Sequence, residues 1–136
     1  MYLSEKTFVM KFLAGLACLG VTTIPFDNQQ FYSGADSMRQ LFSQITDKMG
    51  SRVNELSMLF LRNPMGGIYT EFKEGIARQN GGLLSFENPQ YVSATIKLDE
   101  SGARYILDSK NLDIETETIL DFSREFCKGA GITIKR

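Results

Sequence analysis

The chain has 136 residues, of which 43% are hydrophobic and 23% charged, and its formal net charge at pH 7 is −1. This length and composition predict one ordered globular domain spanning residues 1–136, because a disordered chain has fewer apolar residues and more net charge. The near-zero net charge excludes a global field that would attract nucleic acid or anionic lipid, so binding to either would need a local patch.

Histidine is absent from the sequence, and its absence excludes several kinds of active site. The Ser/His/Asp and Cys/His triads, histidine-bearing metal sites and the most frequent general base near neutral pH all need this residue. The two cysteines, Cys18 and Cys127, lie far apart and follow apolar residues, so we interpret them as buried free thiols. We expect no enzyme activity, no cofactor and no metal site.

The N-terminal segment predicts one helix followed by an extended connector. Between the candidate N-cap Ser4 and the terminating Gly20, apolar residues recur at helical spacing at Phe8, Phe12, Leu16 and Leu19. This helix is apolar over more than half of its circumference, which predicts deep packing or a dimer interface. Its apolar run is too short to span a bilayer, and Glu5 and Lys11 are unlike a signal peptide, so we expect a cytoplasmic protein. The β-branched residues before Pro25 predict a short strand or an extended connector.

Three helices and a hairpin are predicted next. Stripes of apolar residues indicate helices from about residue 35 to 49, from about 52 to 61 and from about 68 to 80. Asn80-Gly81-Gly82 supplies the left-handed geometry that ends the third helix. A short strand is predicted at 83–87 and an alternating one at 91–98, joined by a turn at Asn88-Pro89-Gln90.

Two further helices are predicted after the hairpin, one opening at Asp99 and a last one from about Asp113 to Gly129. In the last helix Asp113, Glu117 and Asp121 are spaced four apart, so they share one face. A Mg²⁺ site or a docking surface for a basic partner is one interpretation of this cluster. Favourable negative charge at a helix N-terminus is the simpler interpretation.

Phe31 and Tyr32 form a second candidate partner surface. They fall in the polar loop that we expect before residue 35, whereas the other aromatic residues mostly occupy inward positions of helices. Clustered exposed aromatic residues are typical of protein interfaces.

From Glu55 to Leu107 the order of elements resembles the winged-helix family of DNA-binding domains. Glu55-Leu56 opens a short helix before a turn and a candidate recognition helix, and Gly82-Leu83-Leu84 leads into a hairpin that corresponds to the wing. The returning strand runs into Leu98-Asp99-Glu100-Ser101-Gly102, similar to the family's Leu-Thr-x-x-Gly signature, with Asp99 in place of threonine.

The resemblance implies an α+β, mostly helical fold. A winged-helix-like core of three helices and a two-stranded wing would span residues 35–98. Residues 1–34 would add an N-terminal helix and connector, and residues 99–136 would add C-terminal helices and a tail.

The resemblance also implies a function for the helix at 68–80, which would lie in a DNA major groove. The candidate DNA-binding residues are Arg62 and Asn63 in the preceding turn and Tyr69, Thr70, Lys73 and Arg78 in the helix. Such a protein would be a small DNA-binding regulator of transcription, and we expect a homodimer formed through the first and last helices.

Two carboxylates on the same helix, Glu71 and Glu74, favour a solvated face instead, since carboxylates repel phosphates. The alternative function is therefore a non-enzymatic protein-binding module on the same scaffold. An adaptor, an antitoxin or immunity-type protein and a subunit of an assembly are the kinds of module that we consider.

Overall fold

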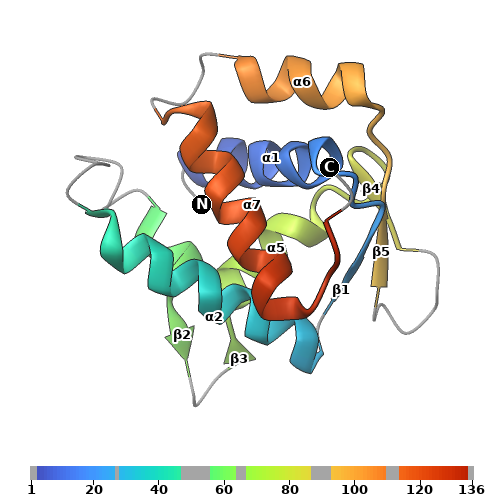
Figure 1. Cartoon of the computed structure of the whole chain (residues 1–136). Helices are drawn as coiled ribbons and strands as arrows, with labels where there is room; N and C mark the ends of the chain where they lie inside the picture. The colour runs from blue at the N-terminus through green and yellow to red at the C-terminus, as the bar shows by residue number, and fades with distance from the viewer. Residues whose placement is uncertain are drawn as a thin grey trace.

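The computed structural model describes residues 3–26, 28–46, 56–63, 67–86, 93–109 and 114–134. These residues form an α+β, mostly helical fold with five α-helices and a small antiparallel sheet of three strands (Figure 1). The helices are α1 (Leu3–Cys18), α2 (Gln29–Gln44), α5 (Thr70–Ala77), α6 (Glu100–Asp108) and α7 (Thr116–Ala130). The sheet contains β1 (Thr23–Pro25), β4 (Leu84–Ser85) and β5 (Ser93–Ile96). A 3₁₀ turn, η1 (Ser57–Phe60), and a hairpin of β2 (Arg62–Asn63) and β3 (Gly67–Ile68) lie between α2 and α5 in the chain.

Helix α7 packs on both α1 and α2, and each of the two contacts requires a glycine. Against α1, a Cβ on Gly15 would overlap Ser123 Oγ, which donates a hydrogen bond to the Phe12 carbonyl oxygen at 3.1 Å. Against α2, a Cβ on Gly129 would overlap the Ser33 carbonyl oxygen. Helix α7 therefore packs as part of the main helical body. The sequence predicted instead that it would be added to a separate core at residues 35–98.

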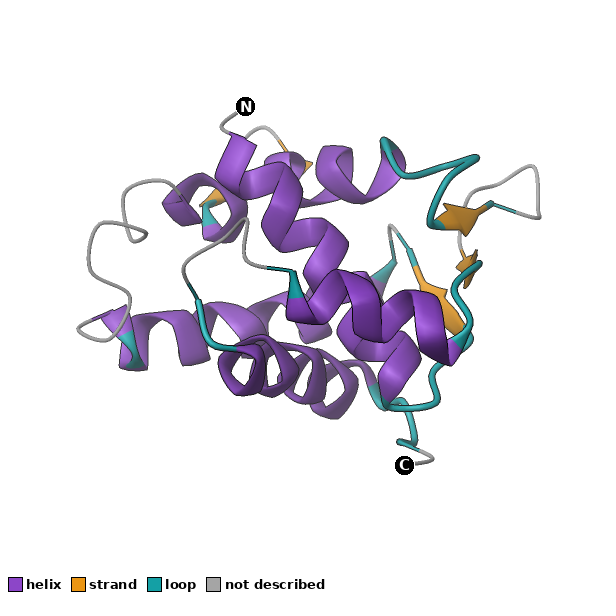
Figure 2. Cartoon of the chain, turned by 90° about the horizontal axis from the view of Figure 1, so that it is seen from above, coloured by secondary structure: helices purple, strands orange, loops and turns teal. Residues whose placement is uncertain are grey.

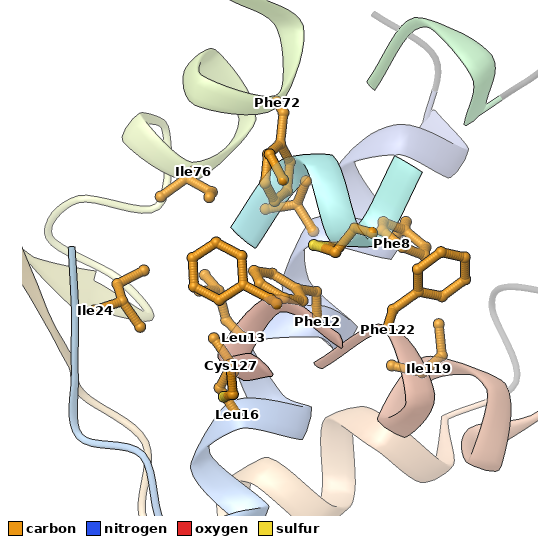
Figure 3. Close-up of a cluster of buried hydrophobic side chains, with 14 of the residues drawn as sticks. Phe8, Phe12, Leu13, Leu16, Ile24, Phe72, Ile76, Ile119, Phe122 and Cys127 are labelled. Carbon is orange, nitrogen blue, oxygen red and sulfur yellow. The ribbon is translucent and has the colours of Figure 1, made fainter. Parts of the chain in front are cut away.

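The core is built from interlocking phenylalanine rings (Figure 3). Phe12 is central: its ring centroid lies 5.5 Å from that of Phe72 and 5.3 Å from that of Phe126. A second group joins Phe8 to Phe122 at 5.2 Å in an edge-to-face arrangement. Such edge-to-face pairs add to the free energy of burial, so the helix crossings are fixed by shape as well as by area.

The first and last helices bury their apolar residues within the chain. The buried residues include Phe8, Phe12, Leu13 and Leu16 of α1 and Ile119, Phe122 and Phe126 of α7. Of the two outcomes predicted for the first helix, deep packing is confirmed. The expected dimer interface through α1 and α7 would have to use other residues of these helices, because their apolar faces are already covered.

The three-stranded sheet has the order β1-β5-β4 and lies at one end of the helical body, as Figure 2 shows. The predicted hairpin is confirmed by the pairing of Leu84 with Ile96, whereas its turn lies outside the described residues. The connector at residues 23–25 adds the third strand, with Thr23 opposite Thr95. The expected two-stranded wing is instead part of a three-stranded sheet, because the other edge of β5 pairs with β1 from the N-terminal part of the chain.

Helix α2 begins at Gln29, well before the predicted start near residue 35. Asn28 is the N-cap, and its Oδ1 accepts a hydrogen bond from the Phe31 amide at 3.0 Å. The polar composition of this segment predicts a loop, yet glutamine is a good helix former and asparagine is a strong N-cap. The interpretation of Phe31 and Tyr32 as loop residues is wrong.

The segment between α2 and α5 also differs from expectation. Of the helix predicted at 52–61, the described part is mainly the 3₁₀ turn η1, and the β2–β3 hairpin after it was not predicted. The third predicted helix, at 68–80, is confirmed as the shorter helix α5. Within the described residues, no helix is both long enough and apolar enough to cross a membrane.

Candidate functional site

The N-terminal end of α5 is fixed by Tyr69, the residue immediately before the helix. Its backbone is left-handed, with φ of 55°, and its side chain is fully buried. The Tyr69 hydroxyl donates a hydrogen bond to Asp36 Oδ1 at 2.5 Å and accepts one from Arg39 Nε at 3.2 Å. The sequence predicted Tyr69 as a DNA-binding residue within the helix, whereas it lies just before the helix and is buried, because a left-handed residue does not follow the helical periodicity of the residues after it.

The Tyr69 hydroxyl is held in its protonated form. Burial raises its pKa most, the hydrogen bond to Asp36 and the charge of Asp36 raise it further, and Arg39 acts in the opposite direction. Together these effects raise the pKa of Tyr69 to about 12. The hydroxyl therefore remains a hydrogen-bond donor to Asp36 well into the alkaline range, and this bond ties the start of α5 to the middle of α2.

A second polar contact joins the same two helices. Lys73 Nζ lies 3.5 Å from the Tyr32 hydroxyl, to which it donates, and 5.9 Å from the centroid of the Tyr32 ring. Both distances are at the outer limit of their kinds of interaction, so this contact is weaker than the one at Tyr69. It nevertheless keeps the Lys73 ammonium beside α2.

Two polar contacts thus join α2 to α5 and to the residue before it, and we call their five residues the α2–α5 seam: Tyr32, Asp36, Arg39, Tyr69 and Lys73. The three α2 members are spaced four and three residues apart, so they share one face of the helix. Asp36 and Arg39 were not predicted from the sequence. Their partner Tyr69 lies 33 and 30 positions further along the chain, so no local pattern pointed to them.

Arg39 presents a cation to solvent at the edge of the seam. Its side chain is exposed, and Nε is used by the Tyr69 hydroxyl. Within the described part of the chain, the two terminal nitrogens form no hydrogen bond or ion pair. Guanidinium donors held in this way are suited to a carboxylate or a phosphate, which they contact with two parallel hydrogen bonds.

Among the predicted DNA-binding residues of α5, Thr70 and Arg78 are exposed and Lys73 is half-buried in the seam. Arg78 pairs with Glu74 at 3.6 Å in an exposed salt bridge, which contributes little to stability. The other two, Arg62 and Asn63, lie in strand β2, where they pair with Ile68 and Gly67 rather than in a simple turn.

The candidate partner surface at Phe31 and Tyr32 is not the exposed aromatic cluster that was predicted. Phe31 is fully buried and stacks on Phe72 with ring centroids 5.5 Å apart, while Tyr32 is half-buried in the seam. The reason is the early start of α2, which turns Phe31 toward the core as the first residue of its apolar stripe.

The acidic face predicted on the last helix is only partly described, because Asp113 lies outside the described residues. Glu117 and Asp121 are exposed and lie 3.7 Å and 3.0 Å from Arg124 Nη1. Across the described ranges, no group of three or more histidine, cysteine, aspartate or glutamate side chains is arranged to hold a metal ion. The acidic residues of α7 thus act first as partners of Arg124.

Comparisons with protein-family models, with curated proteins and with solved structures find no match to this chain. The α2–α5 seam and the elements around it are therefore the features that indicate a function.

Proposed function

We propose that the protein is a winged-helix-like DNA-binding regulator that uses the surface of α2 and α5. The proposal is supported by the order of elements: α5 follows α2 in the chain, and the hairpin of β4 and β5 follows α5. Strand β1 completes the sheet that carries this hairpin. In this arrangement α5 is the recognition helix and the sheet provides the wing.

The observation that carries the proposal is the position of the Arg39 guanidinium, which Tyr69 holds beside the start of α5. Arg39 is oriented by Tyr69 and has two terminal nitrogens directed to no described partner, and the Lys73 ammonium is held on the same seam by Tyr32. The Thr70 side chain is exposed on the first turn of α5. Two cations and a hydroxyl on and beside α5 are the kinds of group that contact phosphates and position a protein on a duplex.

The test is fluorescence anisotropy with labelled duplex DNA over a range of salt concentrations. Two phosphate contacts predict that log K falls against log salt with a slope of about −2, since each contact contributes about −0.9. Arg39→Glu and Lys73→Glu should each weaken binding strongly at low salt. The matched control is Arg104→Glu on α6, an exposed arginine that forms no ion pair within the described residues. Absence of binding by the unmodified protein at low salt contradicts the proposal.

The second candidate function is a non-enzymatic protein-binding module on the same scaffold. It is favoured by the charge of α5, where Lys73 and Arg78 are balanced by Glu71 and Glu74. Two large apolar side chains beside this helix are also exposed, Met58 to 42% and Leu61 to 53%. A pull-down from the native host tests this function, and recovery of only the bait would count against it.

Cytoplasmic location and a homodimer are parts of the same proposal for a regulator. The dimer needs an interface other than the apolar faces of α1 and α7, because these are buried within the chain. Light scattering coupled to size-exclusion chromatography measures the mass in solution, and a monomer at all concentrations would remove the dimer from the proposal without affecting DNA binding.

A further inference from the structure

A cavity of about 190 Å³ lies between α1 and α6, and it shares no residue with the α2–α5 seam. The two helices lie side by side here (Figure 1). An apolar cavity of about 150 Å³ is large enough to bind benzene, so this one has room for a compact organic molecule. Its walls are made by three residues of α1 and three at the end of α6 or just beyond it: Thr7, Met10, Lys11, Tyr105, Ile106 and Ser109.

The Lys11 ammonium in the wall of this cavity is already fully bonded by the protein. Its Nζ donates hydrogen bonds at 3.1, 2.9 and 2.6 Å to the carbonyl oxygens of Ile106, Leu107 and Ser109, which use its three N–H groups, and the residue is 1% exposed. A carboxylate in the cavity would lose its hydration without gaining a donor from Lys11. The cavity therefore favours a neutral molecule over an anion.

The Thr7 hydroxyl is a polar group of the cavity that is left for a ligand. Thr7 is 6% exposed, and within the described residues its hydroxyl forms no hydrogen bond. The Ser109 hydroxyl, by contrast, donates to the Ile106 carbonyl oxygen at 2.8 Å. Since a buried hydroxyl without a partner is unfavourable, a ligand that carries one hydrogen-bonding group would remove this cost.

The rest of the cavity is suited to an aromatic body. Met10 contributes a thioether and Ile106 an aliphatic side chain, and both residues are half-buried. Tyr105 adds a ring that is 80% exposed, the most exposed large hydrophobic side chain in the described part of the chain. Aromatic rings pack favourably against thioethers and against other rings. An aromatic ligand would therefore cover part of the Tyr105 ring.

We propose that the cavity between α1 and α6 binds a compact, neutral aromatic molecule with one hydroxyl group. The ligand hydroxyl lies beside Thr7, and the ring lies against Met10, Ile106 and Tyr105. This site does not depend on the proposed DNA-binding function. The competing explanation is that the cavity is a packing defect between two helices, in which case no compound would saturate it.

Phenol, toluene and benzoate test the size, polarity and charge that the cavity accepts. The full chain, labelled with ¹⁵N, is titrated with each compound and followed by NMR. We expect saturable shifts in α1 and α6 with phenol, and no tighter binding of benzoate than of phenol. Shifts confined to other elements, tighter binding of benzoate, or no saturation by phenol before the protein begins to unfold would overturn the proposal.

Thr7→Val tests the hydroxyl, because it removes this group and keeps the shape of the side chain. The ratio of phenol affinity to toluene affinity should fall about 3- to 10-fold, since a hydrogen bond between neutral groups accounts for a difference of this size. Thr23→Val is the matched control: Thr23 is an exposed residue of β1 outside the cavity, and its replacement should leave the ratio unchanged. An unchanged ratio in Thr7→Val would overturn the proposal.

A second pair of variants tests the aromatic wall independently of Thr7. Tyr105→Ala should weaken phenol binding several-fold, and the side chain is exposed enough to be removed without unfolding the protein. Leu61→Ala is the matched control, because it truncates another exposed apolar side chain outside the cavity and should leave phenol binding unchanged. Equal effects of the two substitutions, or no effect of Tyr105→Ala, would overturn the proposal even if Thr7→Val did not fold.

Discussion

The Tyr69 hydroxyl donates a hydrogen bond to Asp36 Oδ1, across 33 positions of the sequence. It is the strongest described polar link between α2 and α5, because the donor is fully buried and the acceptor is a carboxylate. The link also orients Arg39, whose Nε donates to the same hydroxyl oxygen. One tyrosine therefore sets both the position of α5 and the direction of the cation beside it.

Replacing Tyr69 by phenylalanine should destabilise the protein by about 1.5–3 kcal/mol, because the hydrogen bond to a charged acceptor is lost while the ring remains. Urea denaturation at pH 7 measures this change. Tyr105→Phe is the control: the residue is 80% exposed, so removing its hydroxyl should change stability by less than about 0.5 kcal/mol. A Tyr69→Phe variant as stable as the unmodified protein would show that the link to Asp36 contributes nothing.

The same tyrosine predicts a loss of stability at alkaline pH. The unfolded chain releases the tyrosine proton near its ordinary pKa of 10, whereas the folded chain retains it to about 12. Between these values the unfolded state binds fewer protons, so the free energy of unfolding falls as pH rises. The contribution is complete below pH 10, and about 2–3 kcal/mol is lost by pH 12.

Cys127 contributes in the same direction at slightly lower pH, because burial raises its pKa from 9 to about 11. The measurement therefore compares the pH dependence of the unmodified protein with that of Tyr69→Phe, which retains Cys127. The difference in urea midpoint between the unmodified protein and Tyr69→Phe should be smaller at pH 11.5 than at pH 9.5. Parallel curves would mean that Tyr69 is not protonated preferentially in the folded state.

The elements that the sequence predicted correctly are those in which apolar residues recur with a local period. The stripe of Phe8, Phe12 and Leu16 identified α1, and the alternation around Ala94 and Ile96 identified β5. Both patterns are local because the buried face repeats every few residues. The polar start of α2 was missed because its signal is a single N-cap, Asn28, rather than a repeat.

The candidate site was harder to predict from the sequence than the fold was. The seam joins Asp36 to Tyr69 and Tyr32 to Lys73, pairs that are far apart in the chain and carry no motif. The pairing of Thr23 with Thr95 is equally non-local. The choice of Lys73 as a functional residue needed only its position on a helix, whereas the roles of Asp36 and Arg39 needed the tertiary structure.

The crossing of α2 and α7 predicts that Gly129→Ala is destabilising. The added Cβ would overlap the Ser33 carbonyl oxygen and Ser37 Oγ and would approach Gly34 Cα within 2.9 Å. Backbone atoms cannot move aside without separating the helices, so we expect a loss of about 1–3 kcal/mol, measured by urea or thermal denaturation. Gly82→Ala is the control, since its Cβ would lie 3.5 Å from the Gln79 carbonyl oxygen, an ordinary contact. Equal stability of both variants would contradict the close approach of the two helices.

The start of α6 depends on Asp99, the residue immediately before this helix. It is the N-cap of α6, and its Oδ1 accepts a hydrogen bond from the Gly102 amide at 2.7 Å. Asp99→Ala should cost about 1 kcal/mol, the usual loss for an N-cap, whereas Asp99→Thr should retain most of the stability because threonine also caps. Glu115→Ala is the matched control: Glu115 is the N-cap of α7 but forms no side-chain capping bond, so its replacement should have a much smaller effect. Denaturation curves for the three variants decide the matter, and an Asp99→Ala variant no less stable than Glu115→Ala would rule out a capping role for Asp99.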